Sequence, residues 1–193
     1  AKGKTILKNC AIEPEIKDLI SFLIKLGAKI KLSGRTITIY ENKDKKMKVN
    51  HSVMFDRIEA GTYLIASALV GKKIIINKIK PSIIKTEIDT LKKIGVKIEK
   101  KKTSITVLRN KKLKKINIFT KPYPGFPTDL QAQLMVLLTQ ADGTSKIKED
   151  IFENRFMHVP ELKRMGAKIE TKNKIAAIKG PTKLMGAEVM ATD

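Results

Sequence analysis

The sequence predicts an α/β fold built from repeated βαβαββ units. A short pattern of an apolar residue, glycine, a small residue, lysine and isoleucine occurs three times, about 70 residues apart. A glycine precedes a strand-like run at the start of each copy, and helical periodicity fills the space between. The three patterns are Leu26–Ile30, Ile94–Ile98 and Met165–Ile169, and the leading glycines are Gly3, Gly71 and Gly143.

The middle copy gives the order of elements most clearly. Ile74–Ile76 is a short β-branched run, which predicts a buried strand. Isoleucine and leucine then recur every three or four residues from position 84 to 94, which predicts a helix, and Gly95 stands where a left-handed cap would end it. Two further strands, the second alternating between core and solvent, are predicted at Lys97–Glu99 and Ser104–Val107, on either side of a lysine-rich turn.

The first copy follows the same order, with a helix over positions 16–24 and a strand at Thr36–Ile39, and the third copy repeats it. Between the copies, two strand-like runs each lead into a helix start. These runs are Ser52–Phe55 before Asp56, and Ile116–Phe119 before Thr128.

Two side-chain pairs have the spacing of a capping box at these helix starts, Asp56 with Glu59 and Thr128 with Gln131. The complete unit is therefore βαβαββ. We expect one truncated copy, two nearly complete copies and the opening strand of another at positions 188–190, with a linker at Lys43–Asn50.

Composition restricts the classes of function. The formal charge of +21 is typical of a nucleic-acid binder, but only five of the 40 basic residues are arginine, and aromatic residues make up only 5%. Lysines are spread along every segment, so we expect no nucleic-acid partner. No apolar run approaches the roughly 20 residues that cross a bilayer, so no membrane span is expected.

A single cysteine, Cys10, excludes an internal disulfide and suits a reducing cytosol. The sequence begins without an initiator methionine and stops directly after a strand-like run. We therefore expect a cytoplasmic protein of which this chain is an internal piece.

Three longer runs resemble the bacterial UDP-N-acetylglucosamine enolpyruvyl transferases. They are Asp56–Thr62, Phe126–Gln133 and Phe152–Leu162, the last followed by Arg164–Ala167, and the ending Val189–Asp193 fits as well. The runs occur in the family's order and over essentially the whole chain, and they are far more specific than a glycine-loop motif. The shikimate-pathway enolpyruvyl transferases share the fold but not these runs.

The resemblance implies a fold and an activity. The fold is an inside-out α/β barrel of βαβαββ units in two domains, with the active site between them, which agrees with the repeat in the sequence. Residues 1–54 would end the first domain, and residues 55–193 would form most of the second, truncated at its C-terminus. The family transfers the enolpyruvyl group of phosphoenolpyruvate to the 3-hydroxyl of UDP-N-acetylglucosamine and releases phosphate, without a cofactor, and this reaction commits sugar to peptidoglycan.

The resemblance also implies site residues. A sugar hydroxyl is a weak nucleophile, so a carboxylate must accept its proton, and Asp129 matches that position of the family. Ile151 matches a position whose backbone contacts the nucleotide sugar. Arg155 would face phosphate or carboxylate charge in the cleft, and Asp193 matches an active-site aspartate.

Three of these residues have a structural alternative. Spacing alone favours Asp129 as part of a helix cap with Thr128, Arg155 could pair with Glu153, and Asp193 could be a frayed terminus. No metal site is expected, because the histidines His51 and His158 lack a ligand pattern around them.

The reactive cysteine, the Lys-Asn pair and the later arginines of the family all fall outside these residues. We therefore expect the isolated chain to be inactive and the rest of the parent chain to be its partner. The alternative function is a non-catalytic basic repeat module that binds nucleic acid or anionic surfaces.

Overall fold

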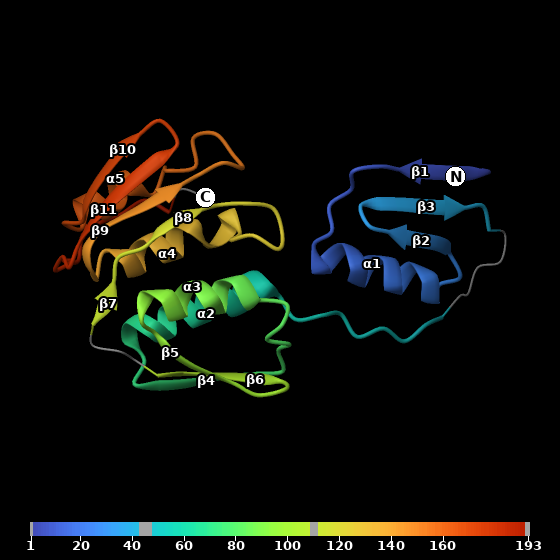
Figure 1. Cartoon of the computed structure of the whole chain (residues 1–193), viewed down its shortest axis with the longest axis horizontal. Helices are drawn as coiled ribbons and strands as arrows, with labels where there is room; N and C mark the ends of the chain where they lie inside the picture. Colours follow the sequence, from blue (N-terminus) through green and yellow to red (C-terminus); the bar gives the residue numbers. More distant parts are fainter. Residues whose placement is uncertain (1, 43–47, 109–111, 192–193) are drawn as a thin grey trace. The chain divides into compact units, whose positions relative to one another are not determined.

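The structure is a computed structural model that describes residues 2–42, 48–108 and 112–191 (Figure 1). The chain divides into two compact units, Ala1–Phe55 and Asp56–Asp193. Within the described residues, no helix is both long enough and apolar enough to span a membrane.

The first unit is one helix on a three-stranded antiparallel sheet. Its elements are β1 (Lys4–Leu7), α1 (Pro14–Lys25), β2 (Lys29–Ser33) and β3 (Thr36–Tyr40). The strand order is β1-β3-β2, so the last strand lies in the centre. Proline at the first helical position suits the start of α1, because its missing N–H would have no partner there. The predicted helix and strand of the first copy are both confirmed.

The second unit begins with the middle copy of the repeat. Its elements are α2 (Arg57–Val70), β4 (Lys73–Asn77), α3 (Lys85–Ile94), β5 (Lys97–Lys100) and β6 (Ser104–Leu108). The strand order β4-β6-β5 again places the last strand in the centre. The predicted cap at the start of α2 is confirmed, because the Asp56 carboxylate accepts from the backbone N–H groups of Ile58 at 2.7 Å and Glu59 at 3.0 Å.

The third copy is a complete βαβαββ unit. Its elements are β7 (Leu113–Lys114), β8 (Asn117–Phe119), the 3-10 turn η1 (Thr128–Leu130), α4 (Gln131–Leu138), β9 (Ala141–Lys148), α5 (Val159–Arg164), β10 (Lys168–Lys172) and β11 (Ile175–Gly180). Strand β8 runs parallel to β9, which continues through antiparallel pairs to β11 and β10. The strand predicted at Ile116–Phe119 is therefore confirmed.

The three copies end their helices in the same way. Gly27, Gly95 and Gly166 have φ of 100°, 102° and 95°. This left-handed conformation is open to glycine and strained for most other residues. The shared geometry confirms that the recurring pattern in the sequence marks one repeated structural unit.

Five details of the sequence prediction are wrong or untested. The segments 52–55 and 188–190 form no strand, and Val53 is 80% exposed. Strand β4 lies at a sheet edge, so Ile75 is half exposed rather than buried, whereas Ile105–Val107 of the central β6 are all buried and do not alternate. Of the predicted linker, residues 43–47 lie outside the described part of the chain.

The core of the second unit is helical. Figure 1 shows α2, α3 and α4 lying between the β4-β6-β5 sheet and the sheet that contains β9. The closest approach is at Gly61 of α2, where an added Cβ would lie 2.3 Å from Cδ1 of the fully buried Leu130. Nearby, Gln133 Nε2 donates to Thr62 Oγ1 at 3.1 Å. Helices inside and sheets outside are the inside-out arrangement that the sequence predicts.

Exposed lysines lie on the edge strands β1, β2, β4, β5 and β10. In the two three-stranded sheets the central strands β3 and β6 contain no lysine, whereas the inner strands β9 and β11 of the third sheet also carry the exposed Lys146 and Lys179. The exposed lysines on these edges are Lys4, Lys29, Lys31, Lys73, Lys97, Lys100, Lys168 and Lys172. An edge strand has unpaired backbone groups, and charge there opposes pairing with another chain.

Candidate active site

Asp129 lies in η1, directly before α4, and its carboxylate is paired across to another segment. Arg155 Nη2 donates to Asp129 Oδ1 at 2.8 Å, and the two side chains are 32% and 52% exposed, respectively. The predicted cap by Thr128 is wrong, because no side chain caps η1 or α4. The hydroxyl of Thr128 donates instead to Glu149 Oε2 at 2.8 Å.

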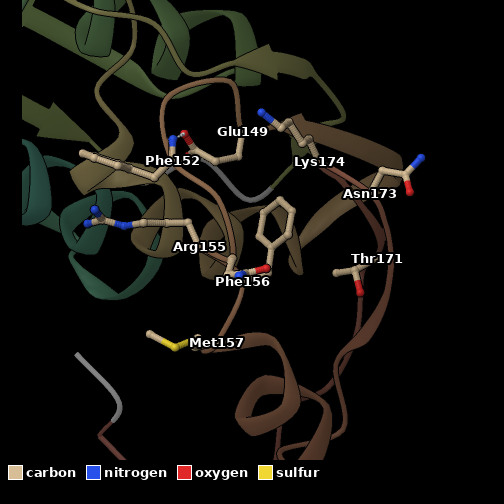
Figure 2. A pocket seen from close by; sticks show the side chains of 9 residues that line it. Glu149, Phe152, Arg155, Phe156, Met157, Thr171, Asn173 and Lys174 are labelled. Carbon is tan, nitrogen blue, oxygen red and sulfur yellow. Dashed lines mark hydrogen bonds between the residues drawn. The ribbon is translucent and has the colours of Figure 1, made fainter.

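Arg155 lies on the irregular segment 151–158, which joins β9 to α5. Its guanidinium carbon lies 5.3 Å from the centre of the Phe152 ring, and both side chains extend the same way (Figure 2). The alternative of a pair with Glu153 is wrong, since the ion pair of Arg155 is with Asp129. Asn154 has a φ of 55°, a left-handed conformation that asparagine tolerates better than most residues, and it turns the chain just before Arg155.

Ile151 uses its backbone N–H inside the protein. This N–H donates to Glu149 Oε1 at 2.8 Å. A backbone contact from Ile151 to a ligand would therefore have to use its carbonyl oxygen. Asp193, the fourth residue implied by the resemblance, lies outside the described residues.

A cavity of about 440 Å³ brings Asp129 and Arg155 together, whereas Ile151 does not line it. Asp129 and Arg155 both line it, and so does Gln131, which is 1% exposed and whose two amide atoms have no hydrogen-bond partner among the described residues. The volume lies within the range of small-molecule sites. The cavity therefore has a carboxylate, a guanidinium and an amide to offer a ligand.

A second cavity, of about 340 Å³, shares Arg155 and Phe152 with the first. Thr171 and Lys174, from the hairpin of β10 and β11, line its other side (Figure 2). The segment 151–158 is therefore a wall between two cavities. Its conformation determines the shape of both.

Glu149 is the residue of this site that sequence reasoning missed. It follows β9, is only 1% exposed, and accepts hydrogen bonds with both carboxylate oxygens. In the sequence, however, a single glutamate after a strand and between Lys148 and Asp150 has the pattern of a solvent-exposed turn. The one available signal was its position just before Ile151.

Among the described residues, no three histidine, cysteine, aspartate or glutamate side chains are grouped so that they could hold a metal ion.

Comparison with known proteins decides the family. The family model of EPSP synthase (3-phosphoshikimate 1-carboxyvinyltransferase) matches residues 1–193. The chain belongs to the EPSP synthase family. The fold agrees: the enolpyruvyl transferase NikO from Streptomyces tendae superposes with a TM-score of 0.83 at 24% identity, over 94% of this chain and 43% of that one. The EPSP synthase from Acinetobacter baumannii gives 0.68 at 20% identity, over 95% and 44%.

More similar relatives carry another name. The UDP-N-acetylglucosamine 1-carboxyvinyltransferase of Pelagibacter ubique is 58% identical over 193 residues, which are all of this chain and 46% of the relative. The protein of the same name from Halothermothrix orenii is 50% identical, again over 193 residues and 46% of its length. The chain thus spans about half the length of the curated relatives that it matches.

Proposed function

We propose that this chain is part of an enzyme that transfers the enolpyruvyl group of phosphoenolpyruvate to the 3-hydroxyl of UDP-N-acetylglucosamine and releases phosphate. The observation that carries the proposal is the 58% identity over all 193 residues to a relative named for this reaction. The enzyme would act in the cytoplasm, in the first committed step of peptidoglycan precursor synthesis, and so support cell shape and division.

The proposed domain boundaries follow the sequence prediction. Residues 1–54 would end the first domain and residues 55–193 would form most of the second. The separation of the chain into units at Phe55 and Asp56 is compatible with this assignment. The remaining parts of the active site would come from the rest of the parent chain.

We assign Asp129 the role of general base. The 3-hydroxyl oxygen of the sugar would form a bond to the central carbon of phosphoenolpyruvate while the Asp129 carboxylate accepts the hydroxyl proton and the terminal carbon, whose double bond opens, takes up a proton from an acid in the rest of the parent chain. Loss of phosphate and of a proton from the adjacent carbon would then restore the double bond. The half-exposed position of Asp129 on a cavity wall supports this role, because a ligand oxygen can reach it.

Arg155 and Ile151 would position the ligands. The Arg155 guanidinium already pairs with a carboxylate, and its planar fork suits the phosphate or carboxylate of a substrate equally well. An anionic ligand would compete with Asp129 for this guanidinium and free the Asp129 oxygen that it holds. Ile151 would offer its carbonyl to the nucleotide sugar, and Asp193 would complete the site.

The test uses the full-length protein that contains this chain. With both substrates present, we expect release of inorganic phosphate that requires UDP-N-acetylglucosamine. Asp129→Asn keeps the shape of the side chain but cannot accept the proton, so we expect kcat to fall by roughly 10²- to 10⁴-fold. Asp142→Asn, at an exposed aspartate of β9, is the matched control and should leave kcat unchanged.

Phosphate release that proceeds equally well without the nucleotide sugar would refute the substrate assignment. Full turnover by Asp129→Asn would refute the assignment of the base while leaving the reaction in place.

The second candidate is a basic module that binds nucleic acid or anionic surfaces, which the net charge of +21 favours. Counterion release would make such binding fall steeply with added salt. Affinity for duplex and single-stranded DNA, measured between 50 and 200 mM salt, separates the two functions. A drop of about 10³-fold or more would support the module, whereas specific turnover of the nucleotide sugar would support the transferase.

A further inference from the structure

Glu149 places a carboxylate inside the second unit with hydrogen-bond donors on every side. Its Oε1 accepts from Thr120 Oγ1 at 2.8 Å and from the backbone N–H groups of Ile151 at 2.8 Å and Phe152 at 3.2 Å. Its Oε2 accepts from Thr128 Oγ1 at 2.8 Å. A carboxylate has roughly four acceptor sites, so these four donors satisfy it. Burial of a charge is costly unless it is satisfied in this way.

The four donors come from three separate segments. Thr120 follows β8, Thr128 begins η1, and Ile151 and Phe152 begin the segment 151–158. Glu149 itself is anchored, because its backbone N–H donates to the carbonyl of Lys174 at 2.8 Å. Removal of the carboxylate would release all three segments from one another at this point.

Two of these segments carry the proposed active-site residues. Asp129 follows Thr128 directly, and Arg155 lies four residues after Ile151. Their own ion pair is partly exposed to solvent, and an exposed ion pair contributes little to stability because water screens it, so this pair alone does not fix the geometry. The contacts of Glu149 are buried, and they hold Thr128, next to Asp129, and Ile151 and Phe152, close to Arg155 in the sequence. They are therefore better suited than the ion pair to hold Asp129 and Arg155 in place.

We propose that Glu149 is a positioning residue, which fixes the Thr128–Asp129 turn against the segment 151–158 and so places the base beside the bound sugar. The proposal rests on the proposed function, because it assumes that Asp129 accepts a proton from the substrate. General base catalysis requires hydrogen-bond reach, so a small displacement of Asp129 lowers the rate. Glu149 touches neither substrate in this account and acts only through its neighbours.

The sharpest variant is Thr128→Val in the full-length protein. Valine keeps the branched shape of threonine but removes the hydroxyl, so only the bond to Glu149 Oε2 is lost. We expect kcat to fall about tenfold, as for the loss of one hydrogen bond to a charged group, while the KM of each substrate changes less than threefold. Thr128→Ser restores the hydroxyl and should return kcat to within about twofold of the wild type.

A double-mutant cycle tests whether the effect passes through Glu149. Glu149→Ala removes every contact of the carboxylate, so Thr128→Val should lower kcat no further in that background. Glu149→Gln should be milder than Glu149→Ala, because its amide oxygen can serve the two backbone N–H groups. Its NH₂ group can then donate to the Thr128 hydroxyl, which rotates to accept.

The control is Ser145→Ala in β9, the strand that ends directly before Glu149. Ser145 is buried, and its Oγ accepts from the backbone N–H of Ile116 at 3.2 Å, so this variant, like Thr128→Val, removes one hydroxyl group and its hydrogen bond. It should lower the thermal midpoint about as much as Thr128→Val but leave kcat unchanged. Hydrogen exchange of the backbone N–H groups at 128–130 and 151–152 gives a readout besides activity, and it should quicken in Glu149→Ala.

A Thr128→Val protein with wild-type kcat, or with a loss equal to that of Ser145→Ala, overturns the positioning role. Additive effects of Thr128→Val and Glu149→Ala overturn it as well. A wild-type protein that turns over neither substrate refutes the proposed function, and with it the positioning role of Glu149 in that reaction. Exchange that is unchanged in Glu149→Ala refutes the structural coupling itself, whatever the activity.

Discussion

Gln131 is a buried amide that borders the cavity beside Asp129 without a protein partner among the described residues. An unpaired buried amide costs about 1–3 kcal/mol, a cost that an apolar side chain of similar length avoids. We expect Gln131→Met to raise the free energy of unfolding by up to ~1 kcal/mol, measured by urea denaturation. We also expect a roughly tenfold higher KM for UDP-N-acetylglucosamine, because its acetamido group can pair with an amide.

Gln133→Met is the matched control, since Gln133 already donates to Thr62. This variant should lower the free energy of unfolding, and it is a control for stability alone because Gln133 lines the same cavity. If Gln131→Met destabilises the protein as much as Gln133→Met does, the Gln131 amide has a partner such as a buried water, and its proposed ligand role is wrong.

At the level of single residues, the resemblance predicted Asp129 and Arg155 well as members of one cavity but could not predict their pairing. The spacing of Thr128 and Gln131 fits a capping box, yet Thr128 donates to Glu149, which is 21 residues away in the sequence and cannot be predicted by a local rule. A buried carboxylate attracts the hydroxyl more strongly than the start of a short 3-10 turn does. Whether a hydroxyl pairs with a backbone group or with a distant carboxylate depends on which groups are buried together. That burial follows from the packing of the fold and cannot be read from the spacing of residues in the sequence.

At the level of elements, helix α2 approaches η1 so closely that Gly61 has no room for a side chain. Alanine there would gain helix propensity of about 1 kcal/mol but would force the buried Leu130 to move. Overpacking costs about 1–3 kcal/mol, so we expect Gly61→Ala to lower the free energy of unfolding by up to ~2 kcal/mol in urea denaturation. Because Leu130 is next to Asp129, kcat should fall as well.

Gly186→Ala provides the comparison, because no atom lies within 4 Å of the added Cβ. It should leave both stability and kcat unchanged. A stability gain from Gly61→Ala would show that Leu130 can repack freely and that the close approach is not needed.

Most elements follow from local patterns in the sequence. The helices α1 and α3 have apolar residues at helical spacing, and glycine in the left-handed conformation ends the turn after each of them. The predictions were wrong where burial or pairing depends on neighbouring segments. Ile75 is on an edge strand and is therefore half exposed, and Ser52–Phe55 pairs with no strand, although both segments have strand-like composition. Composition identifies residues that favour a strand, but pairing depends on which segments meet.

At the level of the whole molecule, the repeat of about 70 residues predicted the architecture, because each copy has a hydrophobic helix face that it cannot bury alone. Copies therefore bury helices together and leave sheets outside, as α2 and α4 do in the second unit. The sequence does not contain the arrangement of donors around Glu149 in any repeated form. Among the described residues that arrangement occurs in the third copy, where we propose that it positions Asp129.

The lysines on the sheet edges give a prediction at this scale. Lys97→Thr with Lys100→Thr removes two positive charges from the edge strand β5, whereas Lys92→Gln with Lys93→Gln removes the same charge from the exposed face of α3. We expect light scattering to show aggregation of the β5 variant at a several-fold lower protein concentration. Equal behaviour of the two variants would mean that net charge alone keeps the chains apart.

The lysine side chains on the sheet edges are exposed to solvent and take no part in the packing of the core. New charge can therefore be placed on these outer strands without disturbing the helices, the cavity or Glu149. The same charge makes the sheet edges of separate chains repel one another, so a substitution that is neutral for the proposed reaction can still oppose association at high protein concentration.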